Sequence, residues 1–377
     1  MDKPKNRVNI RFLYFLCFFM NGVPSVLIPV FPVYGLSLGA KPLELGLMGG
    51  VMAIVYTIST LSLGAVWSKV GRRLPIIFSS VLYCIVYLLY SLTTSTSQII
   101  MLKFFEGFAL SLFWPSVEAL LGTSSGFGEE TTSRFGLSFT SGAAFGSLLS
   151  TFALAWGSFK NLFVIVSSLY LFSAFLSLYF VHDRRNLGGE GDKERERFRI
   201  SGEMFKGLKV IWASVAVSSA SIGIVFSLFP AYADIQKIDV AIIGLSVFLI
   251  TFGRAVAFLV FGRISGTNSA LIRVSTALIA VGVLPLALTK ETVALLAGSF
   301  ALGFGSGLLY SYSFHRVMTI DPRKNDIYAG VFEATIGVGF ITPIVAGALA
   351  EGALNAPYIM VSAVAASLFV IASFMKQ

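Results

Sequence analysis

The sequence GAVWSKVGRR, residues 64–73, is a short polar stretch between two long apolar runs. It carries three cations, Lys69, Arg72 and Arg73, in a chain of which only 12% of the residues are charged. The apolar runs cover residues 43–67 and 74–94. Each is long enough to cross a bilayer, because a membrane-spanning helix needs about 20 consecutive, mostly apolar residues. The stretch therefore predicts a basic turn between two membrane-spanning helices.

The composition of the whole chain extends this interpretation. Of its 377 residues, 56% are hydrophobic and 35 are Phe, more apolar surface than a water-soluble fold of this size can bury. Long apolar runs recur along its length, and helices satisfy their own backbone hydrogen bonds inside lipid. We therefore expect an all-α polytopic membrane protein. Its twelve expected spans are 10–33, 43–67, 74–94, 98–121, 132–157, 160–181, 204–232, 240–263, 269–288, 292–317, 327–350 and 354–375.

The amino terminus, MDKPKNRVNIRFLYFLCFFMNG, joins a basic head to an apolar run, as a secretory signal peptide does. No convincing small-residue cleavage site follows, and the apolar run continues through Pro32. We expect an uncleaved first span, with a cleaved signal as the alternative.

The basic residues indicate an orientation. If both termini are cytoplasmic, only Lys41, Lys160, Lys237 and Lys290 of the 28 Lys and Arg residues lie outside. Lys103 and Arg254 are assigned to the membrane interior, and all the others are assigned to the cytoplasmic side, as the positive-inside rule predicts. The net charge of +9 therefore reflects topology in a cell or plasma membrane, with the lipid bilayer as partner, rather than nucleic-acid binding.

One long polar segment, residues 182–203, divides the expected spans into two sets of six. We expect an amino-terminal six-helix bundle over residues 1–181, a cytoplasmic linker over 182–203 and a carboxy-terminal bundle over 204–377. Glycines recur in the same order in the two halves, which predicts an internal duplication of the kind found in many secondary transporters. The matching pairs are Gly46 with Gly244, Gly64 with Gly262, Gly107 with Gly303 and Gly136 with Gly330.

Twelve spans in two sets of six, the central polar segment and the basic turn together resemble the major facilitator superfamily. The signature loop of that family reads Gly, three residues, Asp, a basic residue, any residue, Gly and two basic residues. The matching residues here are Gly64, Lys69, Gly71, Arg72 and Arg73, whereas Ser68 stands at the aspartate position.

Two further motifs bear on the resemblance. Lys103 and Gly107 resemble a second family signature in span four, with Lys in the usual Arg place. The segment PVFP, residues 29–32, resembles the first-span prolines of the drug-exporter branch, while the Gly-Pro pair of that branch's span-five signature is replaced by GAAFG, residues 142–146.

Ionisable side chains inside a bilayer cost about 2.5 to 3.5 kcal/mol each, so each calls for a reason. Five of the ionisable residues in the expected spans qualify as candidates: Lys103, Glu106, Glu118, Arg254 and Glu333. On an ideal helix Glu106 and Glu118 lie about 60° to either side of Lys103, with Trp114 between Lys103 and Glu118. Span four therefore has one polar face.

The resemblance implies that spans one, four, seven and ten line a central cavity, where Lys103, Glu106 and Trp114 would meet a small-molecule substrate. The alternative is that Lys103 and Glu106, three residues apart, neutralise each other. For Glu118, an ion pair with Arg134 is the alternative.

Spans ten and one add polar candidates. Span ten carries a narrow face of small and hydroxylated residues at steps of three and four: Ser299, Gly303, Ser306, Tyr310 and Ser313. Ser306 and Tyr310 can hydrogen-bond a substrate, or the face can serve helix packing. Asn21 in span one is a further cavity candidate, or it satisfies a neighbouring backbone.

The resemblance also implies a conformational gate where the signature loop meets span eleven. We assign to it Gly64, Ser68, Lys69, Gly71, Arg72, Arg73, Arg254 and Glu333. Because Ser68 replaces the usual carboxylate, the gate needs another anion. Glu333 is the candidate, with Arg254, Arg73 or Lys69 as its expected partner.

Proton coupling would need a carboxylate inside the membrane, because desolvation favours its neutral form and a close cation opposes that shift. Glu106 is the first candidate, and Glu118 and Glu333 follow.

Several function classes are excluded. The segment GLSLG, residues 35–39, matches the serine-hydrolase pattern, but it follows a membrane helix on the side opposite the two histidines, His182 and His315. No Gly-Lys-Ser or Gly-Lys-Thr phosphate loop occurs, and the two His and two Cys have no metal-site spacing. We expect no enzyme, no cofactor and no metal.

These patterns predict a monomeric secondary transporter that moves a small organic solute by alternating access. Export with proton antiport is the leading version, and uptake or uncoupled facilitation is the alternative. A non-transporting membrane receptor or lipid-handling protein is the alternative of another class.

Overall fold

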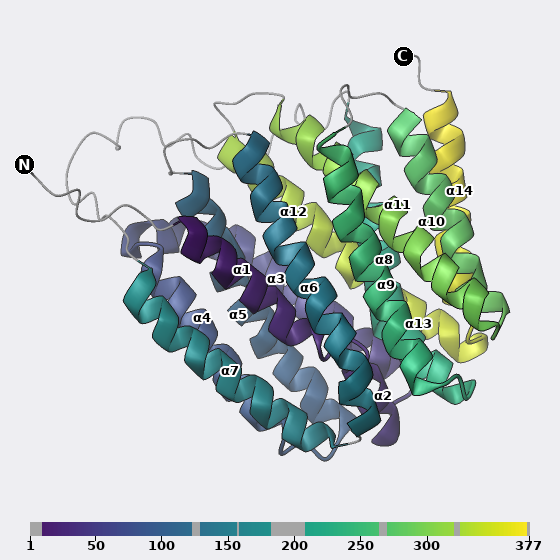
Figure 1. The fold of residues 1–377 in the computed structure, drawn as a ribbon, viewed down its shortest axis with the longest axis horizontal. Coiled ribbons are helices and arrows are strands. Elements are labelled where there is room, and N and C mark those ends of the chain that lie inside the picture. Colours follow the sequence, from purple (N-terminus) through teal and green to yellow (C-terminus); the bar gives the residue numbers. More distant parts are fainter. Residues whose placement is uncertain are drawn as a thin grey trace, which may run out of the picture.

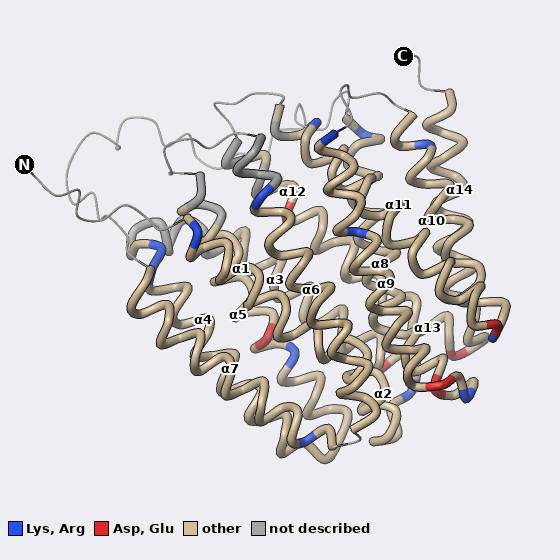
Figure 2. The backbone as a smooth tube through the Cα atoms, viewed as in Figure 1, with Lys and Arg blue, Asp and Glu red and all other residues tan. Residues whose placement is uncertain are grey.

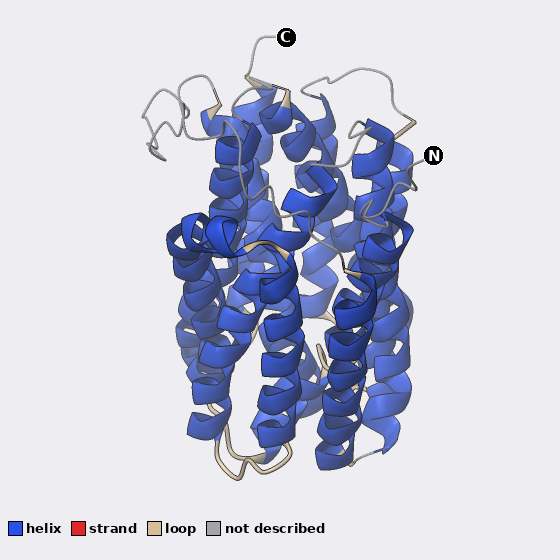
Figure 3. Ribbon diagram, turned by 90° about the vertical axis from the view of Figure 1, so that its left-hand side faces the viewer, coloured by secondary structure: helices blue, strands red, loops and turns tan. Residues whose placement is uncertain are grey.

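The computed structural model describes residues 10–122, 129–156, 158–181, 208–263, 270–319 and 325–374, and the regular elements of these residues are all helices (Figures 1 and 3). They are α1 (Ile10–Ser25), α2 (Val30–Ser37), α3 (Pro42–Val70), α4 (Arg73–Tyr90), α5 (Thr96–Gly122), α6 (Glu129–Trp156), α7 (Phe159–Phe180), α8 (Lys209–Ile235), α9 (Val240–Phe261), α10 (Ala270–Leu288), α11 (Thr292–Met318), α12 (Asn325–Ile341), α13 (Pro343–Gly352) and α14 (Ala356–Ser373).

Within the described residues, twelve helical segments are long and apolar enough to cross a membrane, which confirms the expected number of spans. Two spans consist of two helices each. The first breaks between α1 and α2, where Pro29 precedes α2, and the eleventh breaks at Thr342, which precedes Pro343. Proline has no backbone N–H and clashes with the preceding turn, so it interrupts a helix at such points.

The turn of the opening motif lies between α3 and α4. Gly71 has a φ of 93°, a left-handed conformation that glycine adopts without steric cost. This residue lets the chain reverse direction between Val70 and Arg73. The side chains of residues 63–70, which include Gly64, Ser68 and Lys69 of the expected gate, lie outside the described residues.

The helices of the two halves of the sequence lie side by side (Figure 1). The start of α1 and the end of α14 lie at one end of the bundle, which we call the terminal side, and α2 and α13 lie toward the other end, the far side (Figure 1). Charged positions of the described chain occur mostly near the two ends, with few inside the bundle (Figure 2). The linker predicted at 182–203 lies outside the described residues, so its boundaries stay a prediction.

Two seams join the halves. In one, α6 packs against α9; in the other, α3 packs against α12 and α13. Both need small residues: a Cβ added to Gly46 on α3 would clash with the carbonyl oxygen of Pro343, and one added to Gly244 on α9 would meet Thr151 on α6. Close backbone approach through glycine is a common way for membrane helices to associate.

The same packing recurs inside each half. A Cβ on Gly107 of α5 would clash with the carbonyl oxygen of Met52 on α3, and one on Gly303 of α11 would clash with that of Ile250 on α9. Gly46 with Gly244, and Gly107 with Gly303, are two of the pairs that predict a duplication. The contacts of Gly107 and Gly303 match inside the two bundles, and those of Gly46 and Gly244 lie at corresponding places in the two seams.

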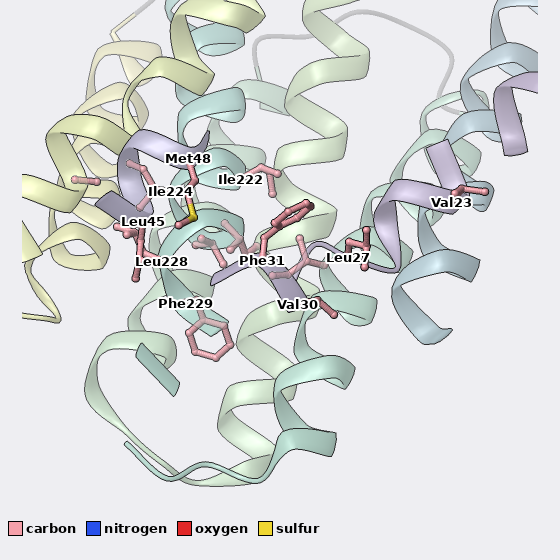
Figure 4. Close-up of a cluster of buried hydrophobic side chains, with 14 of the residues drawn as sticks. Val23, Leu27, Val30, Phe31, Leu45, Met48, Ile222, Ile224, Leu228 and Phe229 are labelled. Carbon is pink, nitrogen blue, oxygen red and sulfur yellow. The ribbon is translucent and has the colours of Figure 1, made fainter. Parts of the chain in front are cut away.

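An apolar cluster joins the halves (Figure 4), and it includes residues of α2, which lies toward the far side (Figure 1). We call it the far-side cluster; it consists of Val23, Leu27, Val30, Phe31, Leu45, Met48, Ile222, Ile224, Leu228 and Phe229. All of these side chains are buried. Beside it, Leu36, Leu45, Leu228 and Tyr358 help to line a cavity of about 30 Å³. The side chains of the two halves leave only this small cavity between them at this point.

Candidate functional site

Lys103 and Glu106 form a buried ion pair within the first half. The Lys103 ammonium lies 2.8 Å from Oε2 of Glu106, and the two residues are 6% and 5% exposed. The hydroxyls of Tyr87 and Tyr90 on α4 donate to the same carboxylate at 3.0 and 2.8 Å. Glu106 therefore accepts from three donors. The pair neutralises itself, as the alternative interpretation expected.

Aromatic rings enclose this pair. The Lys103 ammonium lies 3.5 Å from the ring centroid of Phe31, a member of the far-side cluster. Tyr83 and Tyr87 both stack on Tyr170 of α7, with centroid distances of 4.6 and 5.3 Å. A cation on a ring face in a water-poor site is strongly attracted to it. The surroundings thus hold both charges in place.

Glu333 has a different environment on α12. The hydroxyl of Tyr56 on α3 donates to its Oε2 at 2.8 Å, and this hydrogen bond joins the two halves of the molecule. One turn away in the same seam, a Cβ on Gly337 would clash with Thr57. Sequence reasoning missed Tyr56, because a tyrosine within an apolar run has no distinguishing pattern.

Arg254 and Arg73 do not pair with Glu333. The ion pair of Lys103 with Glu106 is the only one among the described side chains. The Arg254 guanidinium lies 5.9 Å from the ring centroid of Tyr310, and its Nε is buried with no hydrogen-bond partner among those side chains. The guanidinium of Arg73 donates to the carbonyl of Leu178 near the end of α7. The expected partnerships of Glu333 with these two arginines are therefore absent from this conformation.

Arg72 and Glu118 complete the set of charged candidates. Arg72 is partly exposed and immediately precedes α4. Glu118 belongs to α5, but its side chain lies outside the described residues, so its role and its pairing with Arg134 stay predictions.

Two polar candidates are engaged in helix packing. Ser306 is fully buried, its hydroxyl donates to the Gly303 carbonyl at 3.0 Å, and its own carbonyl accepts from Ser218 on α8 at 2.9 Å. The side-chain amide of Asn21 donates to the Phe139 carbonyl on α6 at 2.8 Å. For both residues the geometry corresponds to the packing alternative.

Trp114 and Tyr310 belong to one run of rings that crosses between the halves. We call it the aromatic chain: Trp114 contacts Phe139, which contacts Phe258, then Tyr310, then Phe332, with centroid distances of 5.7, 6.0, 5.7 and 5.3 Å. The contact of Phe139 with Phe258 joins α6 to α9. Sequence reasoning found Trp114 and Tyr310, which carry polar atoms, and missed the phenylalanines. With 35 Phe in the sequence, no single one is conspicuous.

Within the described residues, no cluster of three or more His, Cys, Asp and Glu side chains can hold a metal ion. The described chain is that of an integral membrane protein whose spans form two similar bundles joined along two seams, an arrangement found in many secondary transporters.

Comparison with known proteins identifies the family. The model of the Major Facilitator Superfamily matches residues 11–340, so the chain belongs to this family and is a transporter, not an enzyme. The resemblance seen in the signature loop is thereby confirmed.

Similar proteins include two named for drug resistance. Quinolone resistance protein NorA of Staphylococcus aureus (strain MRSA252) is 23% identical over 97% of this chain and 96% of its own length. A multi-drug resistance efflux pump PmrA homolog of Lactococcus lactis is 22% identical over 91% of this chain and 88% of its own. The crystal structure of the nucleoside transporter NupG has the same fold, with a TM-score of 0.75 at 13% identity, covering 98% of this chain and 100% of that one.

Proposed function

We propose that this protein exports a small organic solute by alternating access, in exchange for protons, with Glu333 as the coupling carboxylate. The observation that carries the proposal is the hydrogen bond between Tyr56 and Glu333. This bond crosses the seam between the two halves. Movement of one half against the other would therefore change the surroundings of the Glu333 carboxylate.

The arrangement of the seams supports alternating access. The far-side cluster packs α2 and α3 against α8, whereas the described residues of α5 and α11 form no comparable seam. This asymmetry supports a state in which the halves are closed toward the far side. The positive-inside rule supports a cytoplasmic terminal side, and we propose that this state accepts solute from the cell interior.

The surroundings of the two carboxylates favour Glu333 over Glu106, the first candidate from sequence. Glu106 accepts from a cation and two tyrosines, all of which stabilise its charged form. For Glu333 the described contact is one neutral hydroxyl, and no ion pair with it occurs in the described part of the chain. A carboxylate without a close cation gains a proton inside a membrane protein at lower cost.

Two relatives named for drug resistance or efflux favour export over uptake as the direction. Uptake and uncoupled facilitation on the same fold are the alternative outcomes of a transport experiment. A lipid-handling role would require lipid dependence without movement of any soluble ligand.

Transport in proteoliposomes tests the proposal. Sugars, organic anions, lipophilic cations and a fluorescent quinolone are offered to vesicles with an imposed pH gradient, and counterflow is measured without a gradient. We expect one class to move and to dissipate the gradient. Glu333→Gln should retain counterflow and lose proton exchange, whereas full proton exchange in this variant would exclude Glu333. Counterflow by none of these solutes would contradict the transport proposal itself.

A further inference from the structure

Arg254 is a cation within a membrane span that has no role in the proposed proton coupling by Glu333. It lies within α9, it is partly exposed, and its Nε is buried with no hydrogen-bond partner in the described part of the chain. It makes no ion pair with any described carboxylate. A cation inside a membrane span without an anion is costly and is retained where it serves a purpose.

The surroundings of Arg254 suggest that purpose. Its guanidinium lies over Tyr310 at 5.9 Å, and Phe258 contacts the same tyrosine ring at 5.7 Å. Phe258 follows Arg254 by four residues on α9, so the two side chains leave the helix on the same face. Arg254, Phe258 and Tyr310 are all partly exposed, whereas Phe332 behind them is fully buried. The rings and the cation therefore share one accessible patch.

The location of this patch suits a substrate. Phe258 also contacts Phe139 on α6, so the patch lies where the two halves meet. It lies on α9 and α11, and the far-side cluster is formed by other helices. A solute at this point touches both halves and can sense their relative movement.

The chemistry of the patch defines a ligand class. A guanidinium is a planar donor that matches a carboxylate with two parallel hydrogen bonds, and such charge-assisted bonds are the stronger ones. Aromatic faces and edges pack well against another flat ring. We propose that Arg254, with Phe258 and Tyr310, binds the anionic group of an aromatic solute whose ring packs along the aromatic chain. This inference rests on the proposed transport function and names its substrate class.

Calorimetric titration of the purified full chain tests it without any gradient or transport. The probes are 1-naphthoate, the neutral 1-naphthamide and the cationic 1-naphthylmethylamine, which share one ring system and differ in charge. We expect wild type to bind the carboxylate at least about tenfold more tightly than the amide, and the amine most weakly.

Variants of Arg254 test whether this residue causes the preference for the carboxylate over the amide. Arg254→Gln should remove the advantage of the carboxylate over the amide and leave the amide affinity unchanged. Arg254→Lys, which keeps the charge and loses the planar fork, should retain only part of the advantage. Arg316→Gln is the matched control, because Arg316 is exposed near the end of α11, and it should bind like wild type.

Equal binding of carboxylate and amide by wild type, or no binding of the carboxylate, overturns the proposal. So does an unchanged preference in Arg254→Gln or, if that variant does not fold, in Arg254→Lys. Tighter binding of the carboxylate than of the amide, with no counterflow, would contradict the transport function and support the proposed site at Arg254. Counterflow of solutes together with no preference for the carboxylate over the amide would support the transport function and contradict the proposed site at Arg254.

Discussion

Two carboxylates inside the membrane, Glu106 in the first half and Glu333 in the second, are held in opposite ways. Glu106 accepts from Lys103, Tyr87 and Tyr90, all on α4 and α5 of one bundle. Glu333 accepts from Tyr56, which belongs to the other bundle. A carboxylate fixed within one rigid body stabilises that body, whereas a carboxylate shared between two bodies responds to their movement. The first carboxylate therefore suits a structural role, and the second suits coupling.

The largest effect should come from breaking the buried pair. Lys103→Met leaves the Glu106 charge without its cation, and loss of one partner of a buried pair costs about 3 to 5 kcal/mol of folding stability. Thermal unfolding in detergent measures it. The double variant Lys103→Met with Glu106→Leu should regain most of the loss, because no charge is left unpaired. A Lys103→Met protein as stable as wild type would contradict the structural role.

The tyrosine donors provide a matched pair of smaller changes. Tyr90→Phe removes a hydrogen bond to a buried charged group, and such bonds contribute about 1.5 to 3 kcal/mol to folding stability. Tyr56→Phe removes a bond between bundles, so each bundle keeps its own packing. We expect the unfolding temperature to fall clearly in Tyr90→Phe and much less in Tyr56→Phe. A larger fall in Tyr56→Phe than in Tyr90→Phe would contradict the assignment of a structural role to the Glu106 site and not to the Glu333 site.

The seam that carries Glu333 can be tested through its glycines. Gly46→Ala places a methyl group against the carbonyl of Pro343, and overpacking of this kind costs about 1 to 3 kcal/mol. Gly352→Ala is the control, since nothing among the described residues lies within 4 Å of the added carbon. We expect reduced thermal stability only in Gly46→Ala. If both variants unfold at the wild-type temperature, α3 and α13 do not pack closely enough to exclude a methyl group.

Much of the fold could be predicted from the sequence. Apolar run length predicts a span, and two of the recurring glycine pairs, Gly46 with Gly244 and Gly107 with Gly303, mark places of close packing in both halves. The pairing of Lys103 with Glu106 follows from a spacing of three residues on one helix. These features are local or repeat regularly, so a linear pattern contains them.

The contacts between the halves could not be predicted in the same way. Tyr56 and Glu333 are 277 residues apart, and their hydrogen bond depends on how two finished bundles dock. The same holds for Phe139 with Phe258. The anion expected to replace the missing aspartate of the signature loop was Glu333, yet its described partner is a neutral tyrosine. The pattern of charged residues predicts a cation as the partner of a carboxylate. It does not predict a tyrosine hydroxyl.

The most direct test is the pH response of the distance between the halves on the terminal side. Spin labels at Leu74 at the start of α4 and Thr319 after α11, both exposed, report that distance in a cysteine-free background. The account predicts that acidification shifts the wild-type distance distribution, that Glu106→Gln still responds, and that Glu333→Gln no longer does. A pH response in Glu333→Gln equal to that of wild type would contradict the assignment of Glu333 as the group that couples protons to movement.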